Sequence, residues 1–149
     1  MRMVDVSAKA ATARRAVATG RVRISRESLE RVQRGQVPKG DVIAAARLAG
    51  IMAAKRTPDL IPLCHPIALT SVEVDVLPDA DDPSLRIVAK VGTTDRTGVE
   101  MEALAAVCAA ALTVYDMLKS SDRGMSFESI QLEHKSGGRT GTWERKRAR

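Results

Sequence analysis

The sequence predicts an α+β fold in which helices pack on one face of an antiparallel sheet. The expected elements follow the order extended segment, helix, helix, strand, strand, helix, strand, which favours an antiparallel sheet with helices on one side. Only residues 77–84 separate two of the expected strands, so no crossover helix fits there and a doubly wound parallel fold is disfavoured. Two alanine-rich helices, over residues 42–56 and 98–120, also indicate tight helix–helix packing.

The first elements are an extended segment and two helices. Apolar residues partly alternate with arginines over residues 4–24, which predicts extended structure with one wet face. Ser25 is a suitable N-cap for a short helix, and Gly35 is a natural stop for it. Asp41 is a suitable N-cap for the helix over residues 42–56. Both helices are therefore expected to begin on side chains that satisfy free backbone N–H groups.

A stiff loop, a hairpin, a long helix and a last strand follow. Three prolines within residues 57–66 predict a loop without regular helix. Alternating apolar residues at 72–76 and again at 85–92 predict an antiparallel hairpin. The remaining expected elements are the helix over residues 98–120, a strand over 125–133 and a glycine-rich loop over 134–141.

The composition indicates one globular domain. The chain has 149 residues, of which 44% are hydrophobic and 28% charged, as is ordinary for a domain with a substantial core. We expect a single domain over residues 1–149, with a basic tail at 144–149 that is disordered. No apolar run approaches the roughly 18 residues of a membrane span, and no signal-type segment is evident, so we expect a cytoplasmic protein with no membrane partner.

The net charge and the cysteine count limit the classes of ligand that the chain is expected to bind. The net charge is +6, and the tail at 144–149 contributes four positive and one negative side chain. Nucleic acid is disfavoured because Tyr115, Phe127 and Trp143 lie far apart in sequence and form no stacking platform, whereas an anionic small molecule remains open. Two cysteines and two histidines make neither a disulfide framework nor a zinc cluster, so no structural metal is expected.

The long helix carries charges at both of its ends. Glu100 and Glu102 stand at its start, while Asp116 and Lys119 share a face near its end. Asp116 and Lys119 could transfer protons, because a carboxylate can orient a lysine whose pKa burial lowers; a plain ion pair and a helix-dipole effect are the alternatives. Glu102 and Asp116 are 14 residues apart in sequence, which is about 21 Å along a helix. Each end therefore needs groups from elsewhere, and a subunit interface could supply them.

Two loops and one helix start also carry candidate groups. His65 is flanked by prolines and suits a preorganised hydrogen bond, with a surface turn as the alternative. Cys64 as a nucleophile with His65 as its base is disfavoured, because neighbours in an extended loop point in opposite directions. Lys39 beside a helix start is a possible anion site. Lys135 and Arg139 flank two glycines and could hold phosphate, although the P-loop pattern is absent.

Taken in order, these pieces resemble the cyclic pyranopterin monophosphate synthases of molybdenum cofactor biosynthesis, the MoaC family. The segments that carry the resemblance are Met3-Val-Asp-Val-Ser-Ala-Lys9, Lys39-Gly-Asp-Val42, Ala53-Ala-Lys-Arg-Thr57, Leu60-Ile-Pro-Leu-Cys-His-Pro66, Thr97-Gly-Val-Glu-Met-Glu-Ala-Leu104, Ala111-Leu-Thr-Val-Tyr-Asp-Met117 and Lys135-Ser-Gly-Gly138. Because several long motifs occur in the same order, the probability that the similarity arose by chance is very small.

The resemblance implies a lyase that converts a cyclised dihydro-GTP intermediate into cyclic pyranopterin monophosphate and releases pyrophosphate. Proton transfers and phosphoryl chemistry suffice, so no cofactor is expected; magnesium could assist the pyrophosphate, but no carboxylate cage for it is evident. The resemblance also implies a ferredoxin-like subunit in a homo-hexamer, a trimer of dimers with pockets between subunits. The rival interpretations are a non-catalytic nucleotide-binding or assembly module and, behind it, a basic nucleic-acid binder.

The resemblance assigns roles residue by residue. The expected catalytic residues are Asp116, Lys119 and Lys39. The expected substrate-binding residues are Leu63, Cys64, His65, Met101, Glu102, Glu100, Lys55, Lys135 and Arg14.

Overall fold

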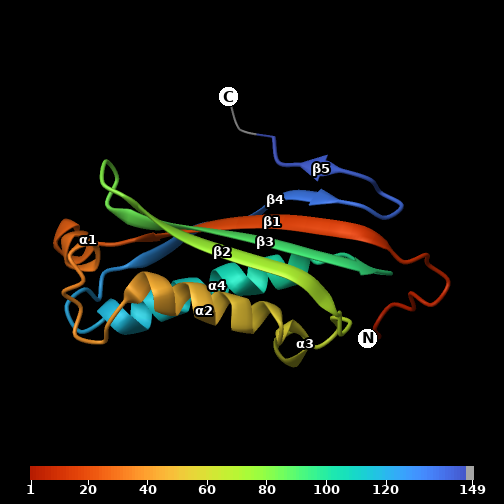
Figure 1. The fold of residues 1–149 in the computed structure, drawn as a ribbon, viewed down its shortest axis with the longest axis horizontal. Coiled ribbons are helices and arrows are strands. Elements are labelled where there is room, and N and C mark those ends of the chain that lie inside the picture. The colour runs from red at the N-terminus through yellow and green to blue at the C-terminus, as the bar shows by residue number, and fades with distance from the viewer. Residues whose placement is uncertain (147–149) are drawn as a thin grey trace.

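A five-stranded antiparallel sheet forms one layer of the molecule in the computed structural model, which describes residues 1–146 (Figure 1). Its strands are β1 (Thr12–Arg23), β2 (Leu69–Asp79), β3 (Ser84–Asp95), β4 (Ser126–Ser136) and β5 (Trp143–Glu144). They lie in the order β2-β3-β1-β4-β5, so the first four strands have the ferredoxin-like arrangement with β1 in the centre. The predicted α+β fold and the predicted hairpin are confirmed.

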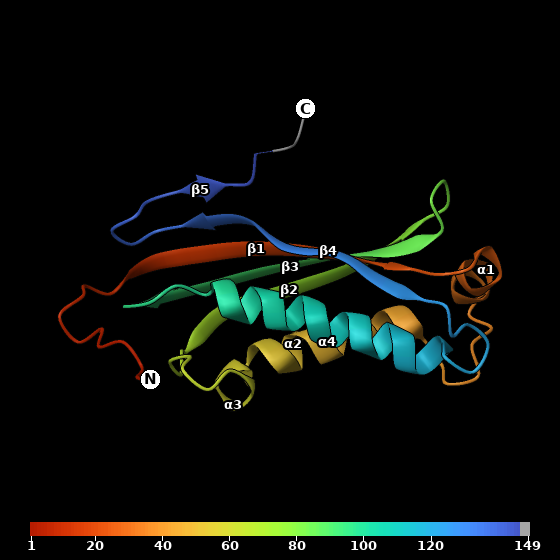
Figure 2. The ribbon, with the colours of Figure 1, turned by 180° about the vertical axis from the view of Figure 1, so that it is seen from behind.

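The second layer is formed by the helices α2 (Val42–Ala54), α3 (Thr57–Leu60) and α4 (Glu100–Leu118), whereas α1 (Arg26–Gln33) lies at one end of the sheet (Figure 1). Figures 1 and 2 show α2 and α4 side by side on the same face of the sheet. Both predicted N-caps are confirmed: the Ser25 hydroxyl accepts the N–H of Ser28, and the Asp41 carboxylate accepts the N–H of Ala44.

Small residues let α2 and α4 approach closely. Gly50 of α2 is buried, and a Cβ at this position would lie 3.0 Å from the carbonyl oxygen of Ala106 in α4. Ala46, Ala103 and Ala110 are buried as well. The predicted tight packing of two alanine-rich helices is therefore confirmed within one subunit, and any larger residue at position 50 would force the helices apart.

The hydrophobic core lies between the helices and the sheet. Its fully covered side chains include Val22, Leu85, Ile87, Val107 and Val114. By length and apolar composition α4 could cross a membrane, but half of it is buried inside the fold, where it packs on α2 and the sheet. This burial is what the core helix of a folded domain requires.

The proline-rich segment departs from the prediction. It was expected to lack helix, yet the one-turn helix α3 begins at Thr57. Pro58 stands in the first turn of this helix, where the missing backbone N–H would have no intrahelical partner anyway. The proline therefore starts a helix here rather than preventing one.

The C-terminal region is also more regular than predicted. β4 runs to Ser136, so His134 and Lys135 lie in a strand and only residues after it form the glycine-rich loop. β5 was not predicted and pairs Trp143 with Lys135. The tail at 144–149 was expected to be disordered, but the N–H of Arg145 donates to the Glu133 carbonyl at 2.9 Å. Residues 147–149 of that prediction lie outside the described residues.

Candidate active site

Near the C-terminal end of α4, Asp116 bridges two lysine ammonium groups. Its Oδ2 lies 2.6 Å from Nζ of Lys39, and its Oδ1 lies 2.7 Å from Nζ of Lys119. Lys39 Nζ also donates to the backbone carbonyl of Asp116 at 2.9 Å. Lys119 caps α4, whereas Lys39 comes from the turn before α2, 77 residues earlier than Asp116. Folding therefore adds a second lysine to the pair that the sequence predicts.

The charges of Asp116 and Lys119 are fixed at neutral pH. Hydrogen bonds from Lys119 and Lys39 lower the pKa of Asp116 to about 2, so it is a carboxylate. The hydrogen bond to Asp116 raises the pKa of Lys119. The idea that burial lowers the pKa of this lysine is therefore wrong for the single protomer, in which Lys119 is 54% exposed. In this state Lys119 can donate a proton but cannot accept one.

At the other end of α4, Glu102 is buried and contacts a thiol. It is only 2% exposed, and its Oε1 accepts a hydrogen bond from Sγ of Cys64 at 3.6 Å. Burial raises the pKa of Glu102, because a charge is poorly solvated there. Its Oε2 is buried without a hydrogen-bond partner among the described residues. A native fold leaves few such atoms, and they often mark a functional group.

The environment of Cys64 argues against covalent catalysis. Burial, and after it the negative charge of Glu102, raises the pKa of the Cys64 thiol to about 11. The nucleophilic form of cysteine is the thiolate, which is scarce under these conditions at neutral pH. The disfavoured nucleophile hypothesis therefore gains no support from the structure.

His65 joins the proline-rich loop to the N-terminal segment. Its Nε2 donates to the carbonyl oxygen of Val4 at 2.7 Å. In the neutral ring this leaves Nδ1 as an acceptor for another group. The contact brings the N-terminal residues to the same end of the molecule as Cys64 and the start of α4 (Figure 2).

Basic side chains gather beside that end. Arg14 of β1 donates through Nε to the carbonyl of Asp95 at 2.8 Å and through Nη2 to the carbonyl of Arg96 at 3.1 Å, just before α4 begins. Lys135 of β4 donates through Nζ to the hydroxyl of Thr140. Arg14 and Lys135 therefore flank the turn that follows β4.

A cavity of about 610 Å³ lies directly beside Arg14. Its lining residues are Ala8, Lys9, Ala10, Thr12, Arg14, Gly138, Arg139 and Thr140. They include three cationic side chains and no carboxylate, so the cavity suits an anion. The sequence analysis named Arg139 as a candidate phosphate ligand but placed neither Lys9 nor Thr12 in a site.

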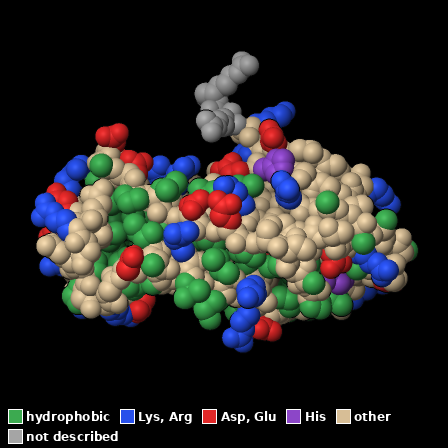
Figure 3. Space-filling model, in the orientation of Figure 1, with side chains coloured by type: hydrophobic (Ala, Val, Ile, Leu, Met, Phe, Trp, Pro, Cys, Tyr) green, Lys and Arg blue, Asp and Glu red, His purple; other side chains and the backbone are tan. Residues whose placement is uncertain are grey.

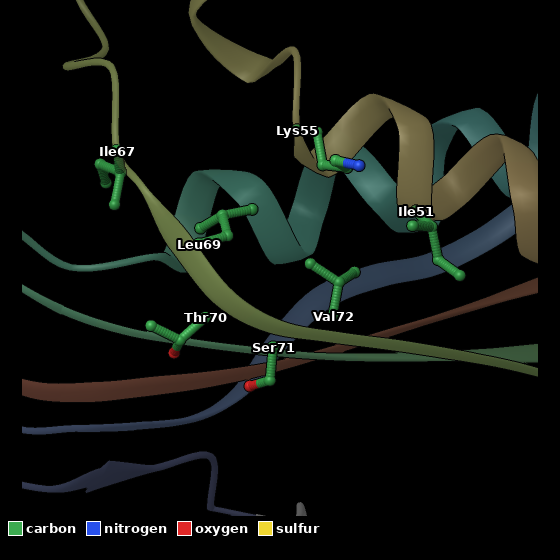
Figure 4. A pocket seen from close by; sticks show the side chains of 7 residues that line it. All are labelled: Ile51, Lys55, Ile67, Leu69, Thr70, Ser71 and Val72. Carbon is green, nitrogen blue, oxygen red and sulfur yellow. The ribbon is translucent and has the colours of Figure 1, made fainter.

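A separate pocket of about 370 Å³ lies between the end of α2 and the start of β2 (Figure 4). Its lining residues are Ile51, Lys55, Ile67, Leu69, Thr70, Ser71 and Val72. Lys55 is the one charged side chain in this lining, so it could pair with an anionic group at the pocket.

The remaining predicted residues lie around Glu102. Leu63 and Met101 are exposed, and Glu100 is half-buried in the first turn of α4. The carboxylate of Glu100 folds back over Gly98, since a Cβ at position 98 would lie 1.9 Å from its Oε2. A side chain at position 98 would therefore displace Glu100.

The predicted residues thus fall into two groups at opposite ends of α4. The group at the helix start, which we call the binding end, comprises Arg14, Lys55, Leu63, Cys64, His65, Glu100, Met101, Glu102 and Lys135. The group at the helix end, which we call the lysine bridge, comprises Lys39, Asp116 and Lys119. Within one protomer the two groups stay about 21 Å apart along the helix axis.

The described residues contain no group of three or more His, Cys, Asp or Glu side chains that could hold a metal ion. On the face seen in Figure 3, acidic and basic side chains are interspersed, and no continuous basic stripe is visible there. A basic stripe is the usual footprint of a nucleic-acid binder. That face therefore gives the nucleic-acid alternative no support.

Comparison with known proteins identifies the relatives of the chain. The MoaC family profile matches residues 3–138. A protein of Thermomicrobium roseum is 62% identical over 144 residues, which cover 97% of this chain and 87% of the relative. A protein of Pelotomaculum thermopropionicum is 55% identical over 145 residues, covering 97% and 85%. One of Roseiflexus sp. (strain RS-1) is 59% identical over 140 residues, covering 94% and 89%. All three are named cyclic pyranopterin monophosphate synthase.

Proposed function

Because this chain belongs to the MoaC family, we propose that it is an enzyme with the activity for which its relatives are named, cyclic pyranopterin monophosphate synthesis. The reaction converts a cyclised dihydro-GTP intermediate into cyclic pyranopterin monophosphate and releases pyrophosphate, an early step of molybdenum cofactor biosynthesis. The observation that carries the proposal is the lysine bridge, in which one carboxylate holds two ammonium groups at 2.6 and 2.7 Å.

The chemistry of the reaction accounts for the lysine bridge. Closing a cyclic phosphate while pyrophosphate leaves requires a hydroxyl to lose its proton, which can pass to solvent water, and the departing pyrophosphate to be stabilised. We assign Asp116, Lys119 and Lys39 to the stabilisation of the departing group. Asp116 orients both ammonium groups, and the protonated lysines supply protons or positive charge where negative charge develops.

The side chains of the binding end match the chemical groups of the proposed substrate. Buried and half-buried carboxylates at Glu102 and Glu100 suit the N–H groups of a guanine-derived base. Arg14 and Lys135 suit the phosphates, since cations and permissive backbone surround the cavity beside them. We assign Leu63, Cys64, His65, Met101 and Lys55 to the same binding surface, because these residues lie with Glu102 at one end of the helix layer.

A site built from both groups needs more than one protomer, so we propose a homo-hexamer, a trimer of dimers. The outer side of the helix layer carries exposed apolar side chains, among them Leu48 and Met52 of α2 and Leu112 of α4. A second copy packed antiparallel on this surface would bring its lysine bridge beside Glu100 and Glu102. The carboxyl groups of Glu100 and Glu102 are opposite in charge to the net positive lysine bridge, which favours that pairing.

The proposed enzyme needs no resident cofactor, and we place it in the cytoplasm. Magnesium could neutralise part of the charge on the leaving pyrophosphate. The cationic side chains that line the 610 Å³ cavity can supply positive charge to the pyrophosphate as magnesium would.

The test is turnover by the purified protein. Incubation with the cyclised substrate should yield cyclic pyranopterin monophosphate and pyrophosphate in equal amounts. Lys119→Ala should keep its oligomeric state and lose the activity. The matched control is Lys90→Ala, which removes an exposed lysine paired with Glu73 at 3.0 Å on another part of the surface. Binding without pyrophosphate release would instead indicate a non-catalytic nucleotide-binding module.

A further inference from the structure

The contact between Cys64 and Glu102 joins a weak donor to a buried acid. Cys64 Sγ lies 3.6 Å from Oε1 of Glu102, on a loop 38 residues earlier in the chain. An S–H group is a weak hydrogen-bond donor and carries no charge while protonated. A lysine or arginine in its place would neutralise the carboxylate, whereas the thiol orients it and leaves its hydrogen-bonding capacity largely intact.

The other carboxyl oxygen has no such partner. Oε2 of Glu102 is buried and accepts no hydrogen bond among the described residues. An ionised carboxylate can accept bonds at both oxygens, so one side of this group is left for a further donor. Leu63 and Met101, the neighbours of Cys64 and Glu102 in sequence, are exposed. A ligand could therefore displace flexible side chains here without unpacking the core.

We propose that Cys64 is a positioning residue, whose thiol holds Oε1 of Glu102 so that Oε2 accepts an N–H group of the guanine-derived base. This inference rests on the proposed function, because it names which atom meets the substrate. Cys64 acts through Glu102 and forms no covalent bond.

Kinetics of two substitutions at position 64 test the role. Cys64→Ala removes the donor and should lower kcat/KM about tenfold, mainly through a higher KM. Cys64→Ser restores a donor and should stay within about threefold of the wild type. Thr113→Val is the control, since it removes another side-chain hydrogen bond of α4, 2.8 Å long to the Ala109 carbonyl, and should change little.

Two outcomes would overturn the proposal. Equal losses in Cys64→Ala and Cys64→Ser would assign the effect to the thiol itself, and an unchanged kcat/KM in Cys64→Ala would remove the role altogether. A double-mutant cycle adds a second criterion: in a Glu102→Gln background, Cys64→Ala should cost much less than in the wild type. Additive losses would contradict a role that acts through Glu102.

Two further measurements separate this inference from the proposed function. If the wild type makes no product, the proposed function fails, and the affinity for GTP then tests Cys64, because GTP presents the same base edge. Cys64→Ala should weaken GTP binding about tenfold and Cys64→Ser should not. Without any ligand, Glu102→Gln should speed alkylation of Cys64 several-fold by removing a nearby negative charge. An unchanged alkylation rate would contradict the contact.

Discussion

The two ends of α4 place the same chemical group in opposite environments. Glu102 at the start is 2% exposed, and burial raises its pKa. Asp116 near the end is 54% exposed, and two lysines lower its pKa to about 2. The comparison teaches that a carboxylate on one helix can be held ready for a ligand or held as a permanent anion, depending on which segments fold against it.

The largest expected effect comes from removing the carboxylate of Asp116. Asp116→Ala should lower kcat about a thousandfold, since both lysines lose the group that orients them. The free energy of unfolding should fall only slightly, because exposed ion pairs contribute little to stability. Product assays and urea unfolding check the two expectations. A kcat near that of the wild type would remove Asp116 from the catalytic group.

Mixing two inactive variants tests whether the ends meet across subunits. Asp116→Ala and Glu102→Gln damage opposite ends of α4, so a mixed dimer keeps one intact site. Random reassortment should restore about a quarter of the wild-type activity. The measurement is activity after the variants are unfolded together and refolded. No gain over the separately refolded variants would contradict shared sites.

Replacing the buried acid should separate stability from activity. Glu102→Met removes a carboxyl whose Oε2 lacks a partner, and should raise the free energy of unfolding by about 1–3 kcal/mol. The same change should abolish substrate binding. Urea unfolding and calorimetric binding are the measurements. A destabilised variant would show that Glu102 contributes to the fold rather than to function alone.

The two carboxylates should give opposite dependences of stability on pH. The pKa of Glu102 is raised in the folded state, so the wild type should lose stability relative to Glu102→Gln as pH rises above 4.5. The pKa of Asp116 is lowered from 3.8 to about 2, so its contribution is present above pH 3.8 and disappears as pH falls towards 2. Denaturant midpoints of the wild type, Glu102→Gln and Asp116→Asn, measured across pH, reveal both dependences. If the two carboxylates changed stability in the same direction with pH, the predicted contrast would be wrong.

The smallest effect is expected from removing divalent metal. Treatment with EDTA should change the rate less than about twofold, because the proposed site would use lysine and arginine side chains to supply cationic charge to the phosphates. Rates before and after EDTA, and after adding magnesium back, provide the measurement. A complete and reversible loss would show that the enzyme needs a metal ion.

Much of the fold could be predicted because local signals agreed with the tertiary structure. Ser25 and Asp41 cap the helices that they were expected to cap. The alternating strands formed the expected hairpin. The signals failed where a residue has two common roles: Pro58 begins a helix instead of interrupting one. The short strand β5 has too few residues to carry a periodic pattern, so no sequence signal could predict it.

The sequence by itself determined which chemical groups the chain offers and where they stand along α4. Residue spacing on a helix is set by 1.5 Å per residue, so the separation of Glu102 from Asp116 follows from numbering alone. Only the tertiary structure decided that Lys39 joins Asp116 and that Cys64 reaches Glu102. Those contacts join segments distant in sequence, and the charge state of each carboxylate depends on the burial and partners that such contacts create.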